Sequence, residues 1–245
     1  MTLLAFALVL SLQSQDDKAA AKSADKAAQE AVDTFEKEYK GGEAKKLAAV
    51  EDLGKTHHPK TASRLGKVVE TSESSSVRQA AVKALGAFTD AKKPAGAVLS
   101  NILPASAKDP GFFGHTCIAI GELKEPVSAN TLAKFFEDKD ENMAKIAIEA
   151  SGKAGCSVSI DPLIQTLGRG ERAIRAAQNA AGGVVTNPSG TNQFLAPPEV
   201  RARDRAKALN PAINKALGEI TKESLATSDA WQAWWARNKD SFDRK

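Results

Sequence analysis

The chain has 245 residues, of which 42% are hydrophobic, only 5% are aromatic and 26% are charged. Most of the apolar content is therefore alanine and aliphatic side chains, which suit thin, closely packed helices better than one large globular core. The formal net charge of +4 is a small excess that bears on solubility before it indicates a nucleic-acid partner.

The first residues carry an uncharged apolar run, 3–12, followed by an abrupt change to charge at Asp16. This run is too short to span a bilayer as a stable helix. We interpret residues 1–14 as a secretory signal peptide; a retained N-terminal anchor and the start of a buried helix are the alternatives. The interpretation predicts an exported protein, periplasmic or extracellular, with no membrane span once the signal is removed.

Residues 15–42 predict an N-terminal capping helix. The segment is rich in Ala, Lys, Glu and Gln, which are strong helix formers. Gly41 and Gly42 would end the helix, and its first half, 18–26, has so little to bury that we expect it to be frayed or disordered. One stripe of apolar side chains recurs at spacings of three and four residues: Ala24, Ala28, Ala31, Phe35 and Tyr39.

Residues 43–218 contain a repeat. Six ten-residue stretches align on a final glycine, and their spacings are 32, 35, 31, 31 and 35 residues. A period of this length is typical of a solenoid of stacked helix pairs. Two positions before the glycine, five of the six copies carry alanine, which lets a neighbouring helix approach closely. The copies are 45–54, 77–86, 112–121, 143–152, 174–183 and 209–218.

We expect each ten-residue stretch to be the second helix of a pair. The first helices are predicted at 59–71, 95–103, 128–137 and 161–167, with a proline at or near each start. The pattern breaks at 184–200, and a loop of that length in a compact array is usually functional or disordered. Residues 201–209 and 211–218 are predicted to form the last helix pair.

The second copy resembles a known family. Val77 and Arg78, followed by Ala80-Ala81 and by Ala84-Leu85-Gly86, resemble the second helix of a short HEAT repeat, the type also found in phycobilin lyases. The resemblance covers about 45–218 and implies an all-α, right-handed α-solenoid of HEAT-like helical hairpins. With the signal peptide, it implies an exported HEAT repeat domain-containing protein.

The C-terminal part, 219–245, predicts one more helix that caps the array. Ser228 and Asp229 can cap its start, and Trp231, Trp234 and Trp235 fall on one face. Three tryptophans can cover the exposed core face at the end of a solenoid. The alternative is an exposed aromatic platform for a ligand.

No catalytic, metal-binding or cofactor-binding residue is assigned from the sequence. His57 and His58 have no Cys, Asp or Glu at ligand spacing. His115 is expected to be a packed histidine bonded to a backbone carbonyl; a joint role with Cys117 is the alternative. The repeat register places Cys117 too far from Cys156 for a disulfide.

The leading functional hypothesis is a non-catalytic scaffold that binds a protein partner. Its alternative, a HEAT-type lyase or accessory enzyme similar to bilin lyases, would require a pocket that holds His115 and Cys117. DNA binding on an array like that of alkylpurine glycosylases is disfavoured, because the outward position three before the glycine mixes acids, bases and apolar residues. Partner-binding residues are predicted as Gln79, Lys83, Lys145, Glu149, Arg172 and Arg175, with the 184–200 loop.

Overall fold

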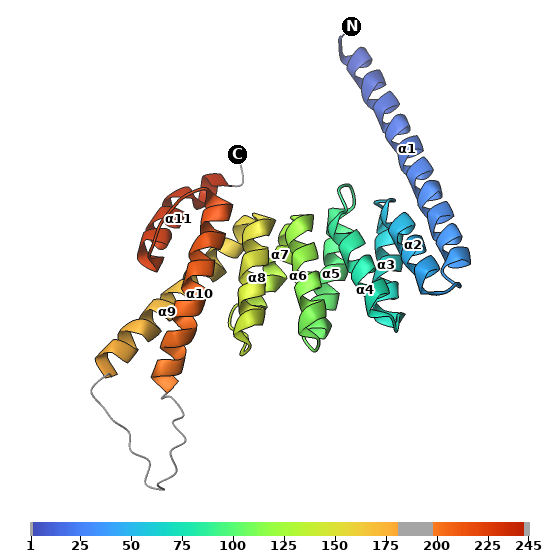
Figure 1. Ribbon diagram of the computed structural model, residues 1–245. Helices are drawn as coiled ribbons and strands as arrows, with labels where there is room; N and C mark the ends of the chain where they lie inside the picture. The colour runs from blue at the N-terminus through green and yellow to red at the C-terminus, as the bar shows by residue number, and fades with distance from the viewer. Residues whose placement is uncertain (1, 181–197, 243–245) are drawn as a thin grey trace. The chain divides into compact units, whose positions relative to one another are not determined.

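The computed structural model describes residues 2–180 and 198–242, with side chains for 18–179 and 198–242. These residues form helices and connecting turns without a strand, and they divide into two compact units, 1–102 and 103–245. None of the described helices is both long enough and apolar enough to cross a bilayer. The all-α, HEAT-like arrangement of neighbouring helix pairs expected from the sequence is confirmed (Figure 1).

The first unit contains α1 (Thr2–Glu38), α2 (Glu43–Gly54), α3 (Pro59–Thr71), α4 (Ser75–Gly86) and the larger part of α5 (Lys92–Ser106). Helix α2 packs on α1 and α4, and α3 packs on α4. Local signals explain the bounds: Pro59 occupies the first turn of α3, and the Ser74 side chain accepts from Val77 N at the start of α4. The helices predicted at 59–71 and from Val77 are therefore present.

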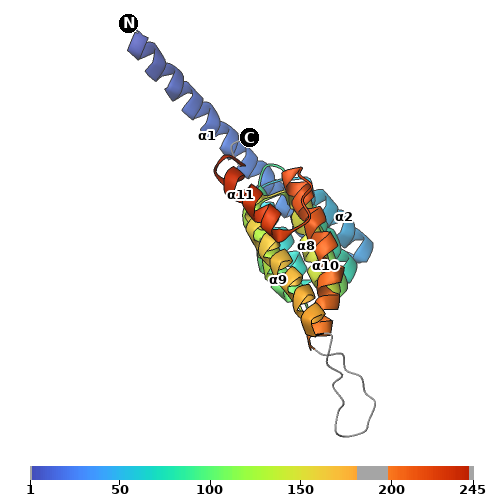
Figure 2. The same ribbon diagram turned by 90° about the vertical axis from the view of Figure 1, so that its left-hand side faces the viewer.

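The second unit contains α6 (Pro110–Leu123), α7 (Pro126–Leu132), η1 (Ala133–Phe135), α8 (Glu141–Ala154), η2 (Ser157–Ser159), α9 (Ile160–Ala180), α10 (Pro198–Thr221) and α11 (Ser228–Phe242). Helix α8 packs on α6 and on α10. Helices α9 and α10 run side by side in opposite directions, as Figures 1 and 2 both show, and α11 packs on α9.

A seam of glycine against alanine joins successive second helices. A Cβ added at Gly54 would lie 2.7 Å from Ala84 Cβ of the next such helix, and one at Gly121 would lie 3.0 Å from the carbonyl oxygen of Ala150. Each of these repeat glycines thus contacts an alanine of the next second helix, and that alanine lies two positions before the repeat glycine of its own helix. This contact is the physical reason for both columns of the repeat.

The same seam corrects the predicted copy at 174–183. A Cβ added at Gly152 would lie 2.8 Å from Ala216 Cα, so the second helix that follows α8 is α10. Residues 174–180 instead belong to α9, an unbroken first helix that continues beyond Leu167, where the predicted first helix ended. Between Gly152 and Gly218, where two helix pairs were predicted, the described residues 153–180 and 198–217 contain one pair, α9 and α10.

Gly170 and Pro211 are of residue types that often end helices, but they lie inside α9 and α10. A Cβ at Gly170 would lie 2.4 Å from Asn210 Oδ1, so this glycine allows α10 to approach α9 closely. Pro211 lies inside α10, which is one helix and not the predicted pair 201–209 and 211–218. Of the predicted loop, 198–200 form the first turn of α10, and 184–197 lie outside the described residues.

Helix α11 uses its tryptophans to pack against the second unit. Trp231 and Trp235 are buried, and Trp231 Nε1 donates to Asn214 Oδ1 of α10 at 2.9 Å. The Ser228 hydroxyl donates to Glu171 Oε2 of α9 at 2.6 Å. The first residues of α11 therefore bond to α9, and its apolar face packs and bonds against the pair formed by α9 and α10.

Candidate functional site

His57 lies in a turn between helices of the first unit. Its Nδ1 lies 2.9 Å from Thr89 Oγ1 and accepts from Thr89 N at 3.2 Å. The His57 ring stacks on Phe88, with 4.8 Å between ring centroids. These contacts join two successive inter-repeat turns, so His57 has a structural role.

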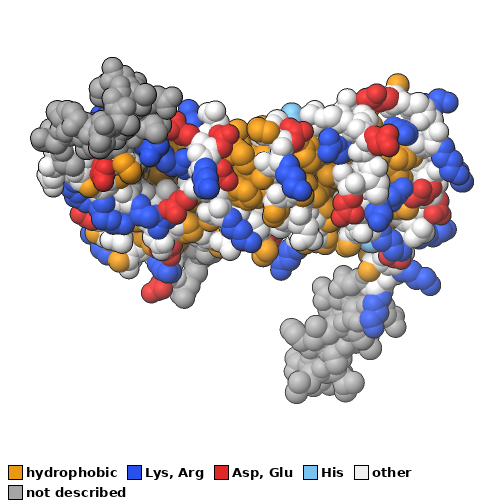
Figure 3. All heavy atoms as spheres, turned by 90° about the horizontal axis from the view of Figure 1, so that it is seen from below, with side chains coloured by type: hydrophobic (Ala, Val, Ile, Leu, Met, Phe, Trp, Pro, Cys, Tyr) orange, Lys and Arg blue, Asp and Glu red, His pale blue; other side chains and the backbone are white. Residues whose placement is uncertain are grey.

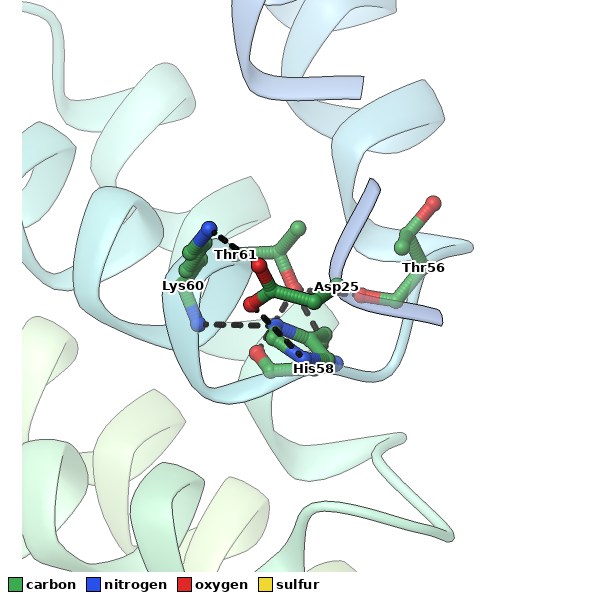
Figure 4. Close-up of polar contacts among 5 residues, drawn as sticks. All are labelled: Asp25, Thr56, His58, Lys60 and Thr61. Atoms are coloured by element: carbon green, nitrogen blue, oxygen red, sulfur yellow. Dashed lines mark hydrogen bonds and ion pairs between the residues drawn. The ribbon is translucent and has the colours of Figure 1, made fainter. Parts of the chain in front are cut away.

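His58 caps α3 and faces the N-terminal helix. Its Nδ1 accepts from Lys60 N at 3.3 Å, and its Nε2 lies 3.9 Å from Asp25 Oδ1 of α1 (Figure 4). Lys60 Nζ contacts Asp25 Oδ2 at 2.9 Å, and the Thr61 hydroxyl donates to the His58 carbonyl at 2.8 Å. In the part of the chain that has been described, no three His, Cys, Asp or Glu side chains gather as metal ligands.

The prediction of a packed His115 is wrong, because this side chain is exposed on α6. Cys117 is fully buried, and burial raises the pKa of its thiol. Two residues apart on a helix, the side chains point to different faces. The pair therefore gives no support to the lyase alternative.

The predicted absence of a disulfide is confirmed. Cys117 and Cys156 are both buried and are not bonded to each other. Cys156 Sγ instead donates to the carbonyl of Ala154 at 3.4 Å.

The predicted partner-binding residues lie on three helices. Lys83 is exposed on α4 and Gln79 is half-buried there, with its Nε2 3.3 Å from Ser75 Oγ. In the second unit, Lys145 and Glu149 are exposed on α8.

Arg172 and Arg175 are also exposed, but they lie on α9. Because α9 is a first helix, Arg175 does not lie on a second helix, as the predicted copy at 174–183 required.

The outward face of α6, α8 and α10 is set by the repeat register. Three positions before each glycine stand Ile118, Glu149 and Lys215, and all three side chains are exposed. Ile118 has 47% of its surface exposed and is one of three large hydrophobic side chains exposed among the described residues, with Val127 and Val158. We call this surface, with Lys145 of the preceding turn, the second-helix face.

At one end of the second-helix face lies an open groove of about 500 Å³. It is formed where α6, α8 and α10 end, and small residues make part of its lining. A Cβ at Gly152 would lie 2.6 Å from Glu219 Oε2, so glycine there leaves the room that the Glu219 side chain occupies. The lining residues of this lysine groove are Lys124, Glu149, Gly152, Lys153, Gly155, Ala212, Lys215, Ala216, Glu219 and Lys222.

Two of the lysines in the groove have an unusual backbone conformation. Lys124 (φ 53°) and Lys222 (φ 65°) are the non-glycine residues with positive φ in the described chain. Each follows the end of a helix, α6 or α10, as Gly155 (φ 67°) follows α8. Glycine is the usual residue for this left-handed cap, since it has no Cβ to clash.

Acidic side chains balance the groove lysines only in part. Lys153 Nζ lies 3.0 Å from Glu122, and Lys215 Nζ lies 3.8 Å from Glu219. Lys222 Nζ donates to the carbonyl oxygen of Glu219 at 2.8 Å. The lining contains four lysines and two glutamates, so it has an excess of positive charge.

Sequence reasoning identified Glu149 of this groove but not its four lysines. A signal was present: Lys124 and Gly155 stand three residues after their repeat glycines, and Lys222 stands four after Gly218. These are the positions where a helix that ends near the glycine requires a cap.

The stacked helix pairs define the class of protein as an α-solenoid of HEAT type. The family model for HEAT repeats matches residues 41–110, which include α2, α3, α4 and α5. Residues 41–110 thus carry HEAT repeats, and the helix pairs from α6 onward keep the same seam of glycine against alanine. No curated protein and no solved structure matches the chain.

Proposed function

We propose that this protein is a non-catalytic scaffold that binds a protein partner through the second-helix face of its second unit. HEAT repeats are generally protein-interaction scaffolds. The observation that carries the proposal is the exposure of Ile118 beside Lys145 and Glu149, on a face that ends in the lysine groove. An exposed apolar side chain among charged ones is the composition of a partner-binding surface with a polar rim.

The charges on the protein favour a protein partner over a nucleic acid. The outward positions Ile118, Glu149 and Lys215 differ in sign and polarity from one helix to the next. On the face shown in Figure 3, Lys and Arg side chains are likewise interspersed with Asp and Glu. A phosphate backbone requires a continuous row of cations.

Export is the second part of the proposal, and it is motivated by the apolar run at 3–12. Fractionation of cells that express the chain with a C-terminal tag tests it. We expect the tagged protein outside the cytoplasm and shortened at its N-terminus. Full-length protein in the cytoplasm would contradict export.

A pair of matched variants tests the scaffold function. Ile118 and Val127 are both exposed aliphatic residues, on α6 and α7 respectively, and Val127 has 65% of its surface exposed. A photo-crosslinking residue at Lys145 should capture a protein from the native source. Ile118→Asp should then reduce the yield of that crosslink about tenfold, which corresponds to about 1.4 kcal/mol, whereas Val127→Asp should leave it unchanged. Equal yields from both variants would remove the second-helix face as the binding surface.

A further inference from the structure

We propose that the lysine groove binds an acidic peptide segment of the protein partner. The inference rests on the proposed scaffold function and adds the chemistry of the ligand. Its starting point is the coincidence of two lysines in a strained conformation, Lys124 and Lys222, in one groove.

The backbone at both lysines favours glycine. At the equivalent end of α8 the chain does use glycine, Gly155, with almost the same φ. A side chain in the left-handed region costs conformational energy, and such outliers gather where function requires the side chain. Lys124 and Lys222 therefore give up stability to place ammonium groups at the rim of the groove.

The fold itself uses these ammonium groups only in part. Lys222 Nζ contacts the Glu219 carbonyl, which is a favourable contact at a helix C-terminus. The ion pairs of Lys153 and Lys215 join side chains that are 41% to 71% exposed, so they contribute little to stability. The cations of the groove can therefore exchange these contacts for a ligand without disrupting the helices.

The helix ends favour a peptide over a compact anion. Three helices end at the groove, and a helix C-terminus presents carbonyl oxygens with a partial negative charge. This charge opposes a phosphate ion placed between the helix ends. A peptide suits both features, because its carboxylates reach the lysines at the rim while its backbone N–H groups can donate to carbonyl oxygens.

The shape of the groove agrees with an extended segment. It is open to solvent, about 500 Å³ in volume, and the residues Gly152, Ala212 and Ala216 leave its lining without bulky side chains. The groove also includes Glu149 of the second-helix face, so one partner can occupy both.

The test is a binding titration with the full chain. The probe is a fluorescein-labelled peptide that alternates glutamate and leucine, and the matched control peptide has glutamine in place of each glutamate. We expect fluorescence anisotropy to show binding of the acidic peptide alone, weakened by added salt. Equal binding of the glutamine peptide would overturn the proposal.

Variants separate a binding role from a capping role. The double variant Lys124→Gly with Lys222→Gly should unfold at a higher urea concentration than the parent and bind the acidic peptide about tenfold more weakly, since two exposed ion pairs are lost. Lys124→Arg with Lys222→Arg should bind like the parent.

The charge control removes two exposed cations from the first half of α10, outside the groove lining. Arg201→Gln with Lys207→Gln leaves the groove intact, so peptide binding should not change. A glycine double variant that is less stable than the parent, or that binds the peptide equally well, would show that the lysines are only helix caps. Tighter binding of polyphosphate than of the acidic peptide would also overturn the proposal.

The two proposals can fail separately. If the protein crosslinked at Lys145 still binds the glycine double variant normally, the peptide inference is wrong and the scaffold function stands. If Ile118→Asp leaves that protein bound, the second-helix face is wrong whatever the peptide does.

Discussion

The seam of glycine against alanine makes a quantitative prediction for the first unit. In Gly54→Ala, the new Cβ would lie 2.7 Å from Ala84 Cβ. Non-bonded carbons prefer about 3.5 to 4.0 Å, so α2 and α4 must separate by on the order of 1 Å. Overpacking of this kind costs about 1–3 kcal/mol, and replacing a helical glycine returns about 0.5–1 kcal/mol. We expect a net destabilisation of about 1–2 kcal/mol.

A second substitution should relieve the overlap. In Ala84→Gly the clashing Cβ is removed, and the nearest remaining atom, Ala84 Cα, lies 3.7 Å from the new carbon. The double variant with Gly54→Ala should therefore be more stable than the sum of the single effects, with a coupling of about 1–2 kcal/mol. Gly114→Ala is the control, because its Cβ would meet nothing closer than Ile146 Cδ1 at 3.9 Å.

Urea unfolding followed by circular dichroism measures these differences, and hydrogen exchange over α2 and α4 shows whether the loss is local. Gly114→Ala should raise stability by up to about 1 kcal/mol. Equal stability of Gly54→Ala and Gly114→Ala, or single effects that add without coupling, would refute the seam as the basis of the repeat.

Three further predictions concern burial and docking. Because burial raises the pKa of the Cys117 thiol, it should stay protonated at mildly alkaline pH and react with iodoacetamide far more slowly in the folded protein than in urea; equal rates would contradict this. Trp231→Phe should cost about 1–3 kcal/mol in urea unfolding, because it leaves Asn214 Oδ1 without its indole donor; an unchanged midpoint would contradict a structural role for this bond. Asp25→Asn removes the ion pair with Lys60, so amide exchange over 18–27 should accelerate while global stability changes by less than about 1 kcal/mol; unchanged exchange would mean that apolar contacts alone hold α1.

The predictable part of the fold is the part with local signals. Pro59 and Ser74 mark helix starts by their own chemistry, and the stretches that end at Gly54, Gly121 and Gly152 reflect one contact that recurs between second helices. The sequence therefore predicts α2 to α4, α6 and α8 at nearly their observed positions.

The last helix pair was not predictable in the same way. Glycine and proline disfavour helices, yet Gly168, Gly170 and Pro211 lie inside α9 and α10. Packing between these two helices overrides the low helix propensity of the three residues. The distance from Gly152 to Gly218 is 66 residues, about twice the repeat period, so a false copy fitted between them.

The candidate site was predictable only in part, for a related reason. Glu149 follows from the register of the repeat, since an exposed position is defined by its distance from the glycine. Lys124 and Lys222 were harder to identify, because lysine rarely adopts positive φ; the only signal for them is their place three or four residues after a repeat glycine, where a helix cap is expected. The exposure of His115 could not be predicted either, because the aligned position in the other copies holds alanine or isoleucine, which suggests a buried site.

The seam has a direction, and this limits how the array can be shortened or extended. Within the second unit each glycine contacts the alanine of the following second helix, so Gly121 meets Ala150 and Gly152 meets Ala216. An excision of residues 122–152 would bring Gly121 into the place of Gly152, with a complete partner surface on α10. A deletion that removes one repeat should therefore begin directly after one repeat glycine and end with the next. The removed segment then takes with it the alanine of one contact and the glycine of the following contact, and the remaining glycine and alanine can meet.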